Sequence, residues 1–360
     1  MIHPVCPLRP VRRRRCLGVA ATHPRKGVGS MYRVVLLVLL LLFAPTVLAT
    51  EMSGFLLEWG SHGTSAGQFD FPVDVTVDGN GQVYVVDRMN CRIQVFSSDG
   101  QHLHQWGAIG TGDNELQYPI GVAVATDGTV YVGDTLNQKI KVFSAAGQLQ
   151  SSWGVEKLPG VSEFYPAELA IDSAGNIYVI AKVVENGGEM ALILKFTGSG
   201  EWVDYWFPIP LPPNGLFSEW SGITIDGNGD ILVADYRNKV IQKYGKDGGA
   251  PIIVCRGQVW GDPESFRSPS DVAVDEQGHI YVLDNWDSKV QVFSETGQYL
   301  FEWGSQGSES GQFDDPEAFA ISPDREIYVA DSGNHRIQMF SAFTTAVQST
   351  SWSAVKMKYK

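Results

Sequence analysis

A unit of roughly 47 residues recurs six times between Gly67 and Phe343, and this repetition restricts the fold more than any single residue does. Its clearest landmark is a Val-x-Asp step at the end of a short apolar run, with Ala181 replacing the aspartate in the third copy. Successive steps are 47, 47, 54, 49 and 47 residues apart. The five aspartates are Asp87, Asp134, Asp235, Asp284 and Asp331. Tandem repetition at this length predicts one supersecondary unit repeated side by side.

Each copy predicts four short β-strands. In the first copy, residues 73–77 and 83–86 alternate in hydrophobicity on either side of the glycine-containing turn 78–81. A third strand is predicted at 92–96, and an outer strand ends at Trp106. Turn residues fall at hairpin distances, and no helical period of useful length is present. Six four-stranded units predict an all-β protein, a six-bladed β-propeller.

The N-terminal part of the repeat region is predicted to close the ring. The sixth copy lacks an outer strand after Phe340, whereas residues 54–60 closely match residues 298–304, which form the outer strand of the fifth copy. We therefore expect the N-terminal strand to complete the last blade and to cover an otherwise open sheet edge.

The repeated strings resemble the NHL repeat: Pro-x-x-Val-x-Val-Asp, then Gly-x-Val-Tyr-Val-x-Asp, then Asn-x-Arg-Ile-Gln-Val-Phe. Asn334 and His335 stand at the positions that give the repeat its name. The resemblance covers nearly all of the chain after residue 50, in five good copies and one degenerate copy. It implies a propeller but no single function, because NHL propellers serve as lyases, RNA readers, sensor domains and scaffolds.

The flanking segments predict export. Residues 31–49 have Arg33 before an apolar run that is short and broken by Pro45, which is typical of a secretory signal peptide rather than a membrane span. Residues 1–30 are a basic extension or an over-called start, residues 50–345 the propeller, and residues 346–360 a C-terminal tail. We expect a secreted or periplasmic protein, with a retained anchor as the alternative.

The charge balance argues against nucleic acid. Residues 1–49 hold eight Lys or Arg and no Asp or Glu, so the remainder has 27 − 8 = 19 basic against 40 acidic residues, a net charge of −21. Such a surface repels phosphate backbones. RNA reading and ubiquitin ligation are also disfavoured because no Cys/His zinc module precedes the repeats. We expect a monomer whose Cys91 and Cys255, in the first and fourth repeats, are free and buried.

Several repeated motifs are expected to be structural. The corner aspartates are each followed by a cation, and catalysis would not need the same pair in five blades; a corner held by a carboxylate would. These cations are Arg92, Lys139, Lys239, Lys289 and Arg336. Ser65 satisfies G-x-S-x-G but lies in a link between blades, not on the strand-to-helix turn that a hydrolase nucleophile needs.

Three carboxylates at one repeat position form a candidate metal site. The second residue after the strand-initiating proline, or its equivalent, is Asp74, Glu168 and Asp271 in blades one, three and five. The intervening blades carry Gly121, Gly222 and Ala318. Because inner strands surround the axis, these carboxylates could gather a hard cation such as calcium, as in the distantly similar lactonase-type propellers. The alternative is a repeat position that tolerates both Asp and Gly.

A zinc site of the kind implied by one NHL enzyme is not expected. The peptidyl-hydroxyglycine amidating lyases hold a central zinc with three histidines. The histidines after residue 50 are His62, His102, His104, His279 and His335. Only His62 and His335 are predicted to share a face, so three convergent histidines cannot be assembled.

The most irregular repeat is the third, and irregular loops on a repeat scaffold often carry recognition. It gains six residues around 185–189 between its second and third strands, and the link 206–214 is rich in proline and aromatics. The candidate ligand-binding residues are Glu185, Glu189, Trp202, Tyr205, Trp206, Trp220, Tyr236, Arg237 and Trp260. Since tryptophan closes other repeats, Trp206 has core packing as an alternative role.

These observations favour an exported, non-catalytic binding or scaffold propeller that recognises a protein, peptide or glycan on the face bearing the blade-three insertion. No cofactor is firmly expected. The alternative is a metal-dependent enzyme of lactonase or lyase type, in which Asp74, Glu168 and Asp271 hold a calcium ion that polarises a carbonyl.

Overall fold

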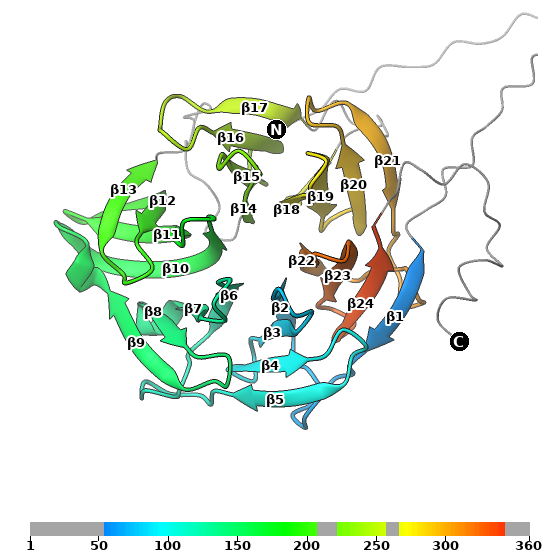
Figure 1. The fold of residues 1–360 in the computed structure, drawn as a ribbon, viewed down its shortest axis with the longest axis horizontal. Coiled ribbons are helices and arrows are strands. Elements are labelled where there is room, and N and C mark those ends of the chain that lie inside the picture. Colours follow the sequence, from blue (N-terminus) through cyan, green and yellow to red (C-terminus); the bar gives the residue numbers. More distant parts are fainter. Residues whose placement is uncertain (1–53, 207–221, 257–265, 343–360) are drawn as a thin grey trace, which may run out of the picture. The chain divides into compact units, whose positions relative to one another are not determined.

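The computed structural model describes residues 54–206, 222–256 and 266–342, which form six four-stranded antiparallel sheets arranged as a ring (Figure 1). This confirms the predicted all-β propeller with four strands per repeat. Within these ranges the only helical segments are two 3-10 turns, η1 (Thr135–Asn137) and η2 (Val155–Lys157). None of the described helical segments is long and apolar enough to cross a membrane. The segments predicted as extension, signal peptide and tail lie outside the described residues.

The sheets follow the repeats in chain order. The first three blades are β2 (Pro72–Val77), β3 (Val83–Asp87), β4 (Arg92–Phe96) and β5 (His102–Trp106); β6 (Pro119–Val124), β7 (Val130–Asp134), β8 (Lys139–Phe143) and β9 (Leu149–Gly154); and β10 (Val161–Ile171), β11 (Ile177–Glu185), β12 (Gly188–Phe196) and β13 (Trp202–Trp206). The last three are β14 (Ile223–Ile225), β15 (Ile231–Asp235), β16 (Val240–Tyr244) and β17 (Ile252–Arg256); β18 (Pro269–Val274), β19 (Ile280–Asp284), β20 (Lys289–Phe293) and β21 (Tyr299–Trp303); and β22 (Pro316–Ile321), β23 (Glu326–Asp331), β24 (Arg336–Ser341) and β1 (Phe55–Trp59).

The N-terminal strand closes the ring, as predicted. β1 pairs antiparallel with β24 and becomes the outer strand of blade six, with Trp59 opposite Ile337. The ring of Trp59 then packs on Tyr328 of its own blade and on Phe96 of blade one, at centroid distances of 6.1 and 5.7 Å. The first described strand therefore joins the two ends of the repeat array.

Large aromatic side chains fill the spaces between blades. Trp106 at the end of β5 lies between Tyr84 of its own blade and Phe143 of the next, 6.4 and 5.6 Å away. Its indole covers Gly147, where an added Cβ would come within 2.7 Å of the ring and where φ is +77°. The turns before β5, β9 and β13 therefore need glycine for both conformation and space, since Gly100 and Gly200 meet tryptophan rings in the same way. Burial of such rings supplies much of the driving force for packing neighbouring blades.

The corner aspartates are structural, as expected. Each of the five is fully buried. Asp87 accepts the backbone N–H of Asp70, at 2.8 Å, and so holds the link that leads into its own inner strand; Asp331 does the same with Asp314, at 2.7 Å. Buried carboxylates that accept several hydrogen bonds pin loops effectively.

The predicted cation partners are correct only where the cation is arginine. Arg92 and Arg336 bond their aspartates through Nε at 2.7 Å. Lys139 is exposed, and Lys289 pairs with Glu302 instead. The more general partner is the residue seven positions after the aspartate, because a side chain there points back into the corner: Gln94, Lys141, Gln242 and Gln338.

Blade three differs through longer strands. The six additional residues do not form an irregular loop but extend β11 and β12, which continue to pair up to Glu185 and Gly188. Asn186 and Gly187 form the turn with φ of 51° and 78°, the left-handed pair that a tight hairpin requires. We call residues 181–192 the blade-three hairpin.

The strand order gives the ring two distinct faces. The upper face carries the turns between second and third strands and the links between blades, and therefore the tip of the blade-three hairpin. The lower face carries the turns between first and second strands and between third and fourth strands. Cys91 and Cys255 are free and buried, as predicted, and burial raises the pKa of the Cys255 thiol to about 12.

Candidate functional site

The inner strands begin beneath the upper face and place one repeat position toward the ring axis. Five of them have a register irregularity immediately after a proline, which is the first residue of β2, β6, β18 and β22 and is Pro166 within β10. A bulge re-aims side chains, so the residues after each proline have orientations that regular strand pairing would not give. These residues include all three carboxylates predicted to bind metal.

Asp74, Glu168 and Asp271 lie close enough for their charges to act on one another, although they come from alternate blades. Burial and then the charge of Asp74 and of Asp271 raise the pKa of Glu168 well above its usual range. Burial, together with Asp271, raises the pKa of Asp74. Burial raises the pKa of Asp271 to about 7. Convergence of the three groups therefore agrees with the repeat pattern.

The small residues in the intervening blades make room for these carboxylates. An added Cβ on Gly222 would lie 1.9 Å from Oδ1 of Asp271, and one on Gly121 would lie 2.9 Å from the Cα of Glu168. The alternation of acidic and small residues thus has a packing cause as well as any functional one.

Asp74 and Asp271 are fastened between blades by backbone hydrogen bonds. Asp74 accepts the N–H of Val75 in its own strand and the N–H of Val122 in blade two, at 2.7 and 2.6 Å. Asp271 likewise accepts the N–H of Val272 and, from blade six, that of Phe319, at 2.7 and 2.9 Å. Each aspartate therefore joins its blade to the following one.

Glu168 differs, because its carboxylate makes no hydrogen bond within the described residues. A second glutamate, Glu317 of β22, was missed by the sequence analysis; its charge contributes to the raised pKa of Glu168, and its own pKa is raised to about 7 mainly by burial. It stands one position earlier in the repeat than the aspartates, so the pattern did not reveal it. We call Asp74, Glu168, Asp271 and Glu317 the axial carboxylates.

One cation lies near this group. Arg88, directly after the corner Asp87, stacks over Phe71 and Tyr118 at 4.9 and 4.8 Å from the ring centroids. Its charge lowers the pKa of Glu168 and of Glu317, against the larger effect of burial. Among the described residues, Arg88 thus opposes only part of what raises the pKa of Glu168 and Glu317.

The axial carboxylates offer the kind of oxygen ligand that a hard cation prefers, but only some of these oxygens are available to bind it. Carboxylate oxygens are the ligands that calcium prefers. Asp74 and Asp271 already accept hydrogen bonds from backbone N–H groups, whereas Glu168 and Glu317 have their oxygens free among the described residues. Any bound cation would therefore depend most on the two glutamates.

The predicted ligand-binding residues do not form one patch. Glu185 and Glu189 lie at the tip of the blade-three hairpin, where Glu189 is 3.9 Å from Lys182. Trp202 and Tyr205 stack at 6.4 Å on the exposed outer strand β13.

Three further predicted residues are also separate from the exposed Trp202–Tyr205 pair, although Trp206 is the last residue of the same strand. Trp206 is buried against Tyr178 and belongs to the core. Tyr236 and Arg237 lie on the upper face of blade four, in the β15–β16 turn. Trp220 and Trp260 lie outside the described residues.

An apolar group on the upper face was not found from the sequence. Met89, Leu136 and Trp286 occupy the same repeat position, two residues after the corner aspartate in blades one, two and five. Their side chains are 55%, 51% and 69% exposed. Because the three residue types differ, no motif marks the position. We call these residues the upper apolar set.

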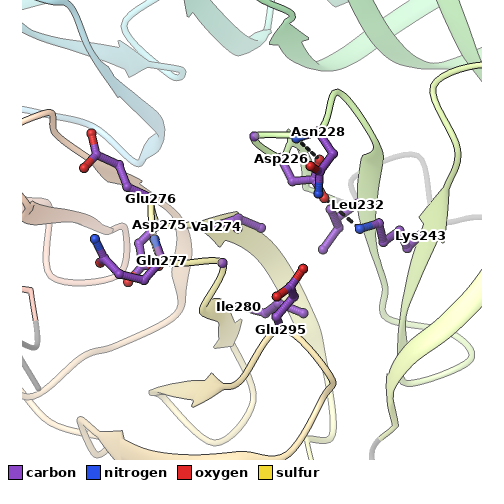
Figure 2. A pocket seen from close by; sticks show the side chains of 12 residues that line it. Asp226, Asn228, Leu232, Lys243, Val274, Asp275, Glu276, Gln277, Ile280 and Glu295 are labelled. Atoms are coloured by element: carbon purple, nitrogen blue, oxygen red, sulfur yellow. Dashed lines mark hydrogen bonds and ion pairs between the residues drawn. The ribbon is translucent and has the colours of Figure 1, made fainter.

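A pocket of about 460 Å³ opens on the lower face between blades four and five. Figure 2 shows Asp226, Asn228 and Lys243 on one wall, with the segment from Val274 to Ile280 on the other. Asp226 accepts backbone N–H groups of its own turn and bonds Lys243 at 2.7 Å. These charges are satisfied within the turns, and the pocket lies on the opposite face from the axial carboxylates' end of the inner strands.

The histidines are arranged as predicted. His102 and His104 lie on β5 and His279 next to the β18–β19 turn, whereas His62 and His335 lie together on the upper face with ring centroids 4.5 Å apart. Three histidines do not converge anywhere in the described part of the chain.

The chain is similar in sequence to proteins that contain NHL repeats. The profile of the NHL repeat matches residues 69–96, 116–143, 266–293 and 313–340. Peptidyl-glycine alpha-amidating monooxygenase B of Xenopus laevis is 34% identical over 106 residues, 27% of this chain and 12% of that protein. Human NHL repeat-containing protein 3 is 47% identical over 47 residues, 12% of this chain and 14% of that protein. The chain thus matches only a small part of these relatives' length.

Solved structures agree on the fold. A gluconolactonase from Xanthomonas campestris superposes with a TM-score of 0.57 at 12% identity, covering 76% of this chain and 86% of that one. Identity at this level shows a shared architecture and leaves activity to be argued from the residues.

Proposed function

We propose that this chain, which belongs to the NHL-repeat β-propellers, is an exported, non-catalytic binding module that takes a basic peptide segment of a partner protein on its upper face. The observation that carries the proposal is the upper apolar set, which lies on the same face as the ends of the inner strands that carry the axial carboxylates. Apolar contact and a site for positive charge are thereby offered on one face.

The apolar component consists of three well-exposed side chains. Met89, Leu136 and Trp286 are more than half exposed, and they come from three different blades at one repeat position. Large apolar side chains gathered on one face of a folded protein are typical of interaction sites, and tryptophan and methionine are enriched there.

The charged component selects for cations. Burial, and after it the charges of Asp74, Asp271 and Glu317, raise the pKa of Glu168, and Arg88 opposes this only in part. A lysine or arginine side chain brought near Glu168 and Glu317 would relieve this repulsion. The net charge of −21 after residue 49 adds long-range attraction for basic partners.

The blade-three hairpin supplies a wall at one side of the same face. Val183 of the hairpin packs in the same core cluster as Phe164 of β10, whereas Nζ of Lys182 lies 4.7 Å from the ring centroid of Tyr165. It is thus a rigid, packed projection able to fix the direction of a bound segment.

The test is selection of peptides from a random library on the immobilised propeller. We expect enrichment of lysine or arginine next to apolar residues. The triple variant Met89→Ser, Leu136→Ser, Trp286→Ser should weaken the selected peptides by at least about tenfold, as loss of several apolar anchors does.

The matched control is Leu103→Ser, Ile252→Ser, Leu300→Ser, which removes exposed apolar residues from outer strands. It should leave affinity unchanged. Enrichment of acidic peptides, or equal losses in the two triple variants, would remove the proposal.

A second candidate function is a calcium-dependent enzyme of lactonase or lyase type. It is favoured by the unbonded Glu168 beside Asp74 and Asp271, which together with Glu317 could hold a cation that polarises a carbonyl. Calorimetry with calcium tests it. Binding heat that disappears in Glu168→Gln would support it, and no heat with no thermal shift would exclude it. The amidating chemistry named for the Xenopus relative is not carried over, since three convergent histidines are missing from the described residues.

A further inference from the structure

Three metal-ligating side chains meet at the seam where blade six joins blade one. His62 and Asp70 lie in the link between β1 and β2, and His335 lies in the turn between β23 and β24. One ligand atom from each lies within 4.8 Å of the others. Oδ1 of Asp70 is 3.6 Å from Nε2 of His62 and 3.9 Å from Nδ1 of His335. None of the functions considered above uses these residues.

The fold itself does not require these residue types. His62 makes a parallel bridge to Phe69, and Ile109 and Gln306 make the same bridge at two other junctions. The matching triplets there are Cys91, Ile109 and Gln117 between blades one and two, and Ser288, Gln306 and Asp314 between blades five and six. Among these three junctions, only the seam therefore combines two imidazoles with a carboxylate.

We propose that His62, Asp70 and His335 bind a divalent first-row transition-metal ion, for which Zn²⁺ is the probe. Two imidazoles and a carboxylate suit zinc, with a fourth position open to water. Imidazole ligands favour zinc, copper or nickel over calcium, so this site is chemically distinct from the axial carboxylates.

The geometry needs only small adjustments. Tetrahedral bonds of about 2.0 Å place ligand atoms about 3.3 Å apart, and the two distances from Asp70 are 3.6 and 3.9 Å. The side chain of His62 is 68% exposed, so it can rotate toward the ion without disturbing packing. The ring contact with His335 already brings the two imidazoles together.

One existing hydrogen bond must be exchanged. Nδ1 of His335 accepts the backbone N–H of Phe71 at 3.1 Å, and a metal ion bound through that nitrogen replaces this donor. The site is therefore expected to bind zinc less tightly than a preorganised one.

The ion would tie the strand link after β1 to blade six, across the closure of the ring. A ligand that binds only the folded state raises the melting temperature in proportion to the logarithm of its concentration above Kd. Zinc should thus stabilise the closed ring, whatever the partner of the upper face is.

The test uses the full chain without a histidine tag, stripped of metal with a chelator. Titration calorimetry should show one Zn²⁺ per chain, and the melting temperature should rise with zinc. The variant His62→Gln copies the residue found at the same bridge in Gln306, so it is expected to fold. It should lose zinc affinity by at least about tenfold, since loss of a direct ligand costs no less than loss of an outer one.

Two controls complete the test. His104→Gln removes an exposed histidine on β5 and should leave zinc binding and the thermal shift unchanged. The melting temperature of metal-free His62→Gln should equal that of the metal-free wild type. Absence of zinc binding in the wild type, or equal zinc affinity in wild type and His62→Gln, would overturn the proposal.

Discussion

At the residue scale, Asp74, Glu168 and Asp271 occupy one repeat position but have different structural roles. Both carboxylate oxygens of Asp74 and of Asp271 accept hydrogen bonds from backbone N–H groups of two blades. Glu168 is one methylene longer and makes no such bond within the described residues. It contributes charge near the axis without fastening blades, which makes it the residue whose replacement should separate function from folding.

Glu168→Gln should therefore stabilise the protein at neutral and higher pH. The folded state raises the pKa of Glu168 and of Asp271, so the folded state binds more protons and stability falls as pH rises from about 4 toward about 7. Removing the charge of Glu168 should raise the melting temperature at pH 8 by about 2 °C or more, at about 2–4 °C for each kcal/mol. At pH 4 the difference should vanish.

Thermal melts from pH 4 to 8 check this, with the exposed Glu295→Gln on the lower face as control. A variant less stable than wild type at pH 8 would mean that Glu168 has an attractive partner after all.

At the element scale, the turn residues in the sequence predicted the strand boundaries closely, but they did not predict which side chains pair. The pair Asn186-Gly187 is typical of a tight hairpin. The additional residues of blade three were nevertheless expected to form a loop, because they depart from the repeat pattern. Lys139 was expected at the corner, but Lys141 bonds Asp134 instead, whereas Arg92 bonds Asp87 from the position equivalent to Lys139. Such choices depend on rotamers that the sequence pattern does not specify.

The closure strand allows a direct test at this scale. Trp59→Ala removes a partly buried indole that packs on Phe96 and Tyr328 across the seam. The loss should be about 2–3 kcal/mol, below that of a fully buried tryptophan, which lowers the melting temperature by roughly 5–10 °C.

Trp202→Ala is the matched control, because Trp202 is 40% exposed on β13. It should change the melting temperature by no more than about 1 °C, as surface substitutions usually do. Equal effects of the two substitutions would argue against closure through β1.

At the scale of the whole molecule, the residues common to all repeats build the ring. The candidate binding residues of the upper face stand at positions where the repeats differ. Convergence of Asp74, Glu168 and Asp271 could be predicted because inner strands surround one axis. The upper apolar set could not be predicted, because Met89, Leu136 and Trp286 share a repeat position but are three different residue types and form no motif. Trp206 was placed with the ligand residues because it begins the link 206–214, which is rich in proline and aromatics, whereas it has the alternative core role.

Hydrogen exchange of the propeller with and without a selected basic peptide tests the central claim most directly. We expect protection on binding in the turns that carry the upper apolar set, residues 87–91, 134–138 and 284–288, and along the blade-three hairpin. The lower-face turns 226–229 and 275–278 should exchange as in the free protein. Protection confined to those lower turns or to the outer strands would contradict the account.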